Sequence, residues 1–226
     1  MARPVFRRGL FVVRSSSTSA ALAGRLFHFW RKLMTDRNPA DILYPNQRAA
    51  EDWKIELKYL PIAHRGHAFL ALVDSDGKIV QELHGMAQSK HTKQIVPMGM
   101  DGADLVAPLD RLMDEGTKTI SSVASGSEDE ILKLWGRGKR AAGAITSQKF
   151  DYKAHDPSYE LGTDGGEIQN SNSVTFTLGK AMGLDLSRAL QEKGMMRTFS
   201  GWDRDLLDPK YKRYVAPPVF PVTHSG

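Results

Sequence analysis

The hydrophobic pattern is most regular in the first third of the chain. Residues 53–60 alternate, with Trp, Ile, Leu and Tyr at the odd positions and Lys or Glu at positions 54, 56 and 58. This period of two predicts a strand with one buried face. Two apolar runs, residues 66–73 and 78–84, then flank Asp-Ser-Asp-Gly at 74–77, the residue types that a tight hairpin turn requires. The pattern therefore predicts an antiparallel sheet.

The hairpin register decides which polar side chains share a face. With Val73 opposite Lys78, His67 lies directly across from His84, and Glu82 lies on their face, diagonal to His67. A slip of one residue would send the two histidines to opposite faces. The other face is predicted to be core, with Ala68, Leu70, Leu72, Ile79, Gln81 and Leu83.

Helical spacing predicts helices at residues 104–113, 128–145 and 186–193. A further helix is predicted from Val174, Leu178, Ala181 and Met182, and the four residues before Val174 are of types that cap helix N-termini. Residues 86–100 and 146–159 are predicted to be irregular. Together these elements predict a single α+β domain at 34–226, an antiparallel sheet flanked by helices with an irregular, proline-rich C-terminal tail.

Charge separates an N-terminal arm from this domain. Residues 1–33 hold seven basic side chains and no acid, whereas the chain from Asp36 onward holds 24 basic and 26 acidic residues. The arm has the composition of an organelle transit peptide. A partner-binding arm and translation from Met34 remain alternatives, so the compartment is left open. Because the domain is nearly neutral, no nucleic-acid partner is predicted.

Composition also excludes several kinds of site. No run approaches 18 consecutive apolar residues, so no transmembrane segment is predicted. The absence of cysteine excludes disulfides, thiolate metal sites and a cysteine nucleophile. The spacing of His64, His67 and His84 matches no zinc-ligand pattern, and neither a metal nor a cofactor is predicted.

The candidate chemistry combines the hairpin with the helix that follows residue 170. A hydroxyl at a helix N-terminus faces unpaired N–H groups and the positive end of the helix dipole, where a developing anion is stabilised. Ser171 is therefore a candidate nucleophile, with His67 as its base and His84 or Glu82 as the group that orients the imidazole. The alternative is that Ser171 and its neighbours only cap the helix.

The order of these parts resembles the circularly permuted papain-like fold, which includes the NlpC-type cell-wall peptidases and the lecithin retinol acyltransferase group. Members have a Gly-His strand and, later, an Asn-Cys pair that opens a helix, with an apolar residue three positions after the cysteine. Here Gly66-His67 is similar to the first motif, and Asn170-Ser171 followed by Val174 is similar to the second. The resemblance covers about a quarter of the chain.

The resemblance implies a hydrolase or acyltransferase that acts on a peptide, amide or ester substrate. Ser171, or Ser173 if the alignment shifts by two, stands where the family has cysteine. His67 would take its proton, while Gln169 and Asn170 would help to hold the oxyanion or position the site. Because a hydroxyl ionises far less readily than a thiol, a second hypothesis stays open. In it the domain is an inactive structural or interaction subunit that contacts a protein partner through its arm and tail.

Overall fold

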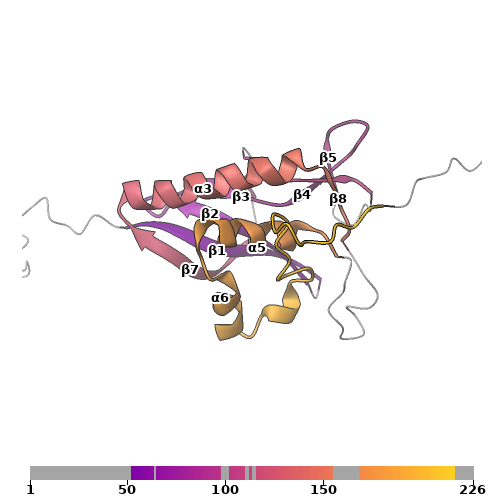
Figure 1. Cartoon of the computed structure of the whole chain (residues 1–226). Coiled ribbons are helices and arrows are strands. Elements are labelled where there is room, and N and C mark those ends of the chain that lie inside the picture. The colour runs from indigo at the N-terminus through magenta and orange to yellow at the C-terminus, as the bar shows by residue number, and fades with distance from the viewer. Residues whose placement is uncertain are drawn as a thin grey trace, which may run out of the picture. The chain divides into compact units, whose positions relative to one another are not determined.

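The computed structural model describes residues 52–63, 65–97, 102–109, 112–113, 116–154 and 168–216. These residues form an α+β fold with two antiparallel sheets and three α-helices (Figure 1). The predicted N-terminal arm, residues 1–33, lies outside the described residues. The α+β class and the antiparallel sheet are confirmed.

The first sheet contains the predicted strand and hairpin. Its strand order is β3-β2-β1-β7, formed by β1 (Trp53–Ile62), β2 (Arg65–Val73), β3 (Ile79–Leu83) and β7 (Lys118–Gly126). On the predicted core face of the hairpin, Ala68, Leu70, Leu72 and Leu83 are all buried in the main hydrophobic cluster. The prediction of that face is confirmed for these four residues.

The hairpin register differs from the predicted one by two residues. Asp74 N–H donates to the Lys78 carbonyl at 3.0 Å, so the loop has three residues, with Gly77 at φ 79°. Val73 consequently pairs with Ile79 rather than Lys78, and a second one-residue offset, a bulge, lies directly before Val73. Each offset exchanges the two faces once. The two offsets together return both histidines to one face.

The second sheet was not predicted. Its order is β5-β4-β6-β8, formed by β4 (Met86–Gln88), β5 (Ile95–Val96), β6 (Asp104–Val106) and β8 (Phe150–Asp151). These short strands lie in segments predicted as irregular, or, for β6, as helix. The helix predicted at 104–113 is wrong. Pro108 disfavours helical backbone at Ala107, and residues 104–106 pair with β4 while residues 104 and 105 also pair with β8.

The remaining helix predictions are confirmed. The structure has α3 (Glu128–Ser147), α5 (Ser171–Met182) and α6 (Leu186–Glu192), followed by the 3₁₀ turn η1 (Met196–Thr198). α3 begins with a capping box between Ser127 and Glu130 and buries Ile131 and Trp135. α3 contacts β1 and β3 as well as α5, and α5 packs on β2. This packing places α5 beside β2 (Figure 1), and Asn172 in its first turn bonds Ala68 of that strand.

Candidate active site

The first turn of α5 occupies the edge of β2 that β3 leaves unpaired. Pairing with β3 ends at Leu83, and beyond it Ala68 N–H donates to Asn172 Oδ1 at 2.9 Å. Asn172 Nδ2 donates to the Gly66 carbonyl at 3.2 Å. The side chain of Asn172 thus makes the hydrogen bonds that a neighbouring strand would make to the residues just before and just after His67.

Gly85 allows this close approach. A Cβ at Gly85 would lie 2.6 Å from Ser171 Cα and 2.7 Å from Val174 Cβ, distances that real Cβ atoms essentially never show. Because Gly85 directly follows His84, the Ser171 backbone lies beside the segment that carries this histidine. The structure therefore brings the helix start, with Ser171, next to the strand segments that carry His67 and His84.

The polar side chains of the hairpin form one buried chain. His67 Nε2 lies 3.3 Å from His84 Nδ1, and His84 Nε2 lies 2.9 Å from Glu82 Oε2. The prediction that the histidines lie directly across from each other is wrong. Since Glu82 pairs with Ala71, His84 meets Phe69, whose ring stacks on it at 4.6 Å, and His67 reaches His84 diagonally.

One set of histidine tautomers satisfies the hydrogen bonds of this chain. Glu82 Oε2 also accepts from Met113 N–H at 2.6 Å, so this oxygen is an acceptor and His84 Nε2 carries the proton that it donates. In a neutral His84, Nδ1 then accepts from His67 Nε2–H. In this set of tautomers, His67 Nδ1 carries no proton. The three side chains are at most 1% exposed, so the carboxylate acts in a dry environment.

Ser171 opens the helix, and Asn170 caps it. Asn170 Oδ1 accepts from the N–H groups of Asn172 at 2.9 Å and Ser173 at 3.3 Å, so the predicted capping is confirmed. Within the described part of the chain, neither the N–H nor the Oγ of Ser171 makes a hydrogen bond. The hydroxyl therefore has no bond to either histidine there, although Ser171 is only 3% exposed.

Two other predicted site residues have structural partners instead. Ser173 Oγ donates to a backbone carbonyl at 2.8 Å, so its hydroxyl is already engaged. Gln169 Nε2 donates to the carbonyls of Asp151 and Tyr214, and its Oε1 accepts from Tyr214 N–H at 3.3 Å. This amide holds the C-terminal segment against β8.

The segment after η1 covers the start of α5. The Ser200 carbonyl accepts from Asn170 Nδ2 at 3.2 Å and from Asn172 Nδ2 at 3.0 Å. The Phe199 ring lies so close to Gly66 that a Cβ there would be 2.5 Å from it. The sequence indicates only an irregular covering at this place. Asn170 at the N-cap of α5 and Asn172 in its first turn were the sequence signal for a segment that covers the start of this helix, because their side-chain amides can donate to the carbonyl of such a segment.

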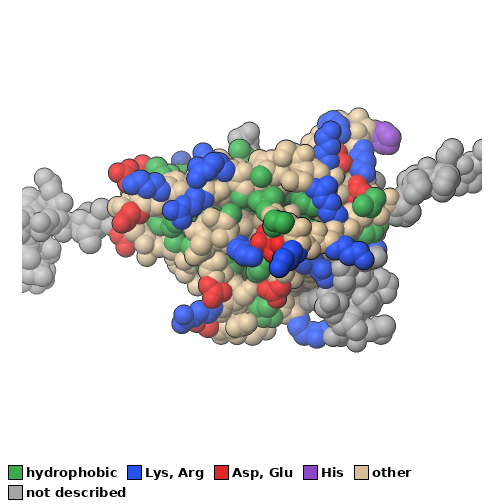
Figure 2. Space-filling view, in the orientation of Figure 1, with side chains coloured by type: hydrophobic (Ala, Val, Ile, Leu, Met, Phe, Trp, Pro, Cys, Tyr) green, Lys and Arg blue, Asp and Glu red, His purple; other side chains and the backbone are tan. Residues whose placement is uncertain are grey.

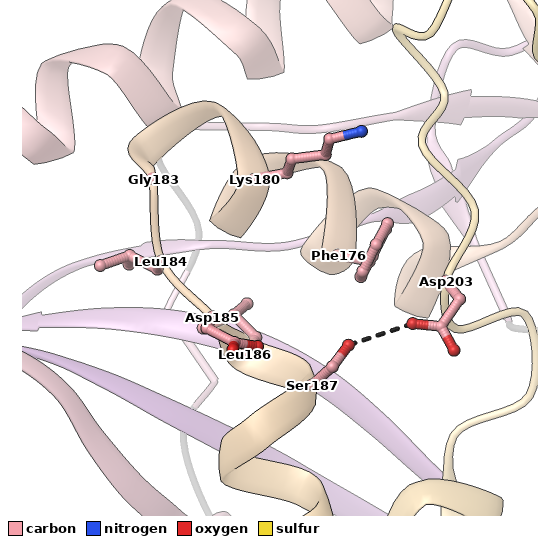
Figure 3. Close-up of a pocket in the computed structure, with 8 residues that line it drawn as sticks. All are labelled: Phe176, Lys180, Gly183, Leu184, Asp185, Leu186, Ser187 and Asp203. Carbon is pink, nitrogen blue, oxygen red and sulfur yellow. Dashed lines mark hydrogen bonds between the residues drawn. The ribbon is translucent and has the colours of Figure 1, made fainter.

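A separate hollow of about 420 Å³ lies at the other end of α5 (Figure 3). It is lined by Phe176, Lys180, Gly183, Leu184, Asp185, Leu186, Ser187 and Asp203. Ser187 Oγ donates to Asp203 at 3.0 Å and accepts from Trp202 Nε1 at 3.0 Å. A hydrogen bond to Asp205 raises the pKa of Lys180 and keeps it charged. The lining residues of this hollow include no histidine.

Neither a metal centre nor a membrane span is found in the described ranges. There, no group of three or more His, Cys, Asp or Glu side chains is placed to hold a metal ion, and His64 lies outside these ranges. The described helices are all too short or too polar to cross a bilayer.

Comparisons with protein-family models, curated proteins and solved structures find no match for this chain. The class of protein is therefore defined by its own geometry. It is an α+β protein in which a buried Glu-His-His chain lies beside a helix that begins with serine.

Proposed function

We propose that this protein is a hydrolase or acyltransferase that cleaves an amide or ester bond, with a permuted papain-like arrangement and Ser171 as nucleophile. One observation carries the proposal. Asn172, the residue after Ser171, hydrogen-bonds the backbone on both sides of His67. This ties the candidate nucleophile to the candidate base although the two are about 100 residues apart in the sequence.

In the proposed reaction, Ser171 Oγ attacks the carbonyl carbon of the substrate while His67 Nδ1 takes the hydroxyl proton. A C–O bond forms, and the carbonyl oxygen becomes an oxyanion beside the Ser171 N–H. When the intermediate collapses, the C–N or C–O bond to the leaving group breaks and His67 returns the proton to that group. Water, or an acceptor alcohol or amine, then repeats the two steps on the acyl-enzyme.

The Glu82–His84 pair supports the base. When His67 takes a proton, its Nε2–H still donates to His84 Nδ1, and the carboxylate of Glu82 stabilises the positive charge through His84. This arrangement differs from a nucleophile–base–carboxylate triad in that a second imidazole, that of His84, lies between the base and the carboxylate. Such support is needed because a serine hydroxyl is a much weaker acid than the thiol of the family.

The second candidate function is an inactive interaction subunit, and the observation behind it is the position of Ser171. Ser171 is 3% exposed, and its Oγ has no hydrogen bond to an imidazole in the described part of the chain. Catalytic hydrogen bonds are often long or misaligned before substrate binds, so this geometry is compatible with both functions. The reactivity of the Ser171 hydroxyl distinguishes the two candidate functions.

The test is reaction with a fluorophosphonate probe, with the labelled peptide identified by mass spectrometry. We expect labelling at Ser171, its loss in Ser171→Ala, and a rate at least about 100-fold lower in His67→Ala. Ser187→Ala is the matched control, since Ser187 also lies in the first turn of a helix but in the hollow without histidine. Labelling that persists in both site variants, or that disappears in Ser187→Ala, would refute the assignment of Ser171.

A further inference from the structure

A group of basic side chains surrounds β8 and the turn between β4 and β5. We call it the basic face, and it consists of Lys90, Lys93, Lys149, Lys153 and Arg213. Figure 2 shows Lys and Arg side chains gathered over this end of the molecule. In the sequence these residues are spread over more than 120 positions, which explains why a count of charges along the chain does not detect them as a group.

Two ion pairs fix the turn over the second sheet. Lys90 pairs with Asp151 on β8, and Lys93 pairs with Asp104 on β6 at 3.2 Å. The lysine side chains are 44% and 63% exposed, whereas each aspartate side chain is only 14% exposed. The surface therefore presents ammonium groups to solvent, with the carboxylates beneath them.

Aromatic rings hold the other side of the basic face. The Arg213 guanidinium lies 4.4 Å from the centre of the Phe150 ring, and Lys153 Nζ lies 4.5 Å from that of Tyr214. Both cations gain from these rings. Because the cations lie over these two ring faces, the faces are not available as platforms for stacking of nucleic-acid bases.

The basic face stands out against the charge of the remaining domain. It contains five basic residues, of which Lys90 is paired with Asp151 and Lys93 with Asp104. Without these seven residues, the chain from Asp36 onward keeps 19 basic and 24 acidic residues. The basic face is thus more cationic than the domain as a whole, and such a concentration of charge attracts and orients anionic ligands.

The basic face adjoins the candidate active site. Lys153 N–H donates to the Gln169 carbonyl at 2.8 Å, and Gln169 N–H donates back at 3.0 Å. Gln169 precedes Ser171 by two residues, and Asn170 also bonds the chain next to Lys153, at the Ala154 carbonyl. The backbone of the basic face is therefore hydrogen-bonded directly to the chain that leads into α5.

We propose that the basic face binds an acidic peptide segment of the substrate, placing an adjacent bond at Ser171. This inference rests on the proposed function. A peptide supplies both the carboxylates that ammonium and guanidinium groups bind and the amide bond that the site would cleave. Nucleic acid is disfavoured because the rings of Phe150 and Tyr214 are covered, and an anionic membrane because the β4–β5 turn, residues 89–94, exposes no apolar side chain for insertion.

The binding test uses the full chain with Ser171→Ala, so that no turnover is required. The probe is fluorescein-labelled decaglutamate, and decaglutamine is its uncharged counterpart. We expect fluorescence anisotropy to show binding of decaglutamate only, weakened by added salt. Neutralising Lys93 and Lys149 to Gln together should raise the Kd about tenfold, from modest contributions of two surface charges. The matched control neutralises Lys139 and Arg140, which are exposed on α3, and should leave the Kd unchanged.

A second readout links the basic face to the reaction. In the wild-type protein, decaglutamate should slow fluorophosphonate labelling of Ser171, and decaglutamine should not. Equal binding of the two peptides, an equal effect of the α3 control pair, or tighter binding of a ten-nucleotide DNA strand would overturn the inference. Labelling without peptide binding refutes this inference alone. Peptide binding without labelling refutes the proposed function, and with it the assignment of the peptide as substrate.

Discussion

The close packing of Gly85 on α5 gives the sharpest prediction. In Gly85→Ala the added Cβ would meet Ser171 Cα at 2.6 Å, about 0.8 Å inside the 3.4 Å at which ordinary contact begins. The nearest obstacle is helix backbone, which cannot rotate away as the end of a side chain can. Gly85 is buried and is not among the described residues with positive φ. The effect is therefore one of packing and not of backbone strain.

Overpacking of a core usually costs about 1–3 kcal/mol, and a backbone obstacle places Gly85→Ala near 3 kcal/mol. For a domain of this size that corresponds to a fall in Tm of about 6–12 °C. Equilibrium urea unfolding measures the free energy directly, with an unchanged m-value as the check that the transition remains two-state.

The matched control is Gly143→Ala on the exposed side of α3, where an added Cβ meets no atom within 4 Å. Alanine there should stabilise the protein by about 0.5–1 kcal/mol, because glycine weakens a helix interior. A Gly85→Ala protein within 0.5 kcal/mol of wild type would refute the close approach of α5 to this segment. The proximity of Ser171 to His84 would then be refuted too.

Two further predictions concern the hydrogen bonds that hold the site together. Asn172→Ala removes two donations and one acceptance at a side chain that is 3% exposed. It should lower the free energy of unfolding by about 2–4 kcal/mol, clearly more than Thr175→Val, and equal losses in urea unfolding would contradict the role of Asn172. Burial raises the pKa of Tyr211 above 10.0, while nearby Arg204 lowers it. The neutral phenol therefore contributes stability that is complete below pH 10 and is lost as pH rises through the raised pKa. Tyr211→Phe should lose the bond to Gln169 at neutral pH, yet show a shallower decline in Tm above pH 10; an unchanged alkaline decline would contradict this.

Local patterns were sufficient for much of the fold. The alternation at residues 53–60, the Asp-Gly turn and the helical spacing after residue 170 each predict an element that the structure contains. They succeed because one periodicity dominates each segment. The segment 104–113 fails because Leu105 and Leu109 have helical spacing while Pro108 opposes helical backbone between them. The two- and three-residue strands of the second sheet are too short to show any period.

The candidate site was predictable as a set of residue types but not as geometry. The sequence pattern selects His67, His84, Glu82 and Ser171, yet it places the histidines directly opposite each other because it counts the turn as a four-residue loop and has no signal for the bulge. The bonds of Asn172 connect segments about 100 positions apart, and no local pattern encodes such contacts. The role of Gln169 in holding the C-terminal segment is hidden for the same reason.

The paired offsets of the β2–β3 hairpin have a consequence for changes in its length. Inserting or deleting one residue between Val73 and Ile79 would reverse the facing of every residue on β3 relative to β2. His84 would then point into the hydrophobic cluster and Leu83 would take its place beside His67. Inserting two residues would preserve both faces. The hairpin therefore tolerates length changes in steps of two, and a single-residue insertion should remove the site while leaving the strands in place.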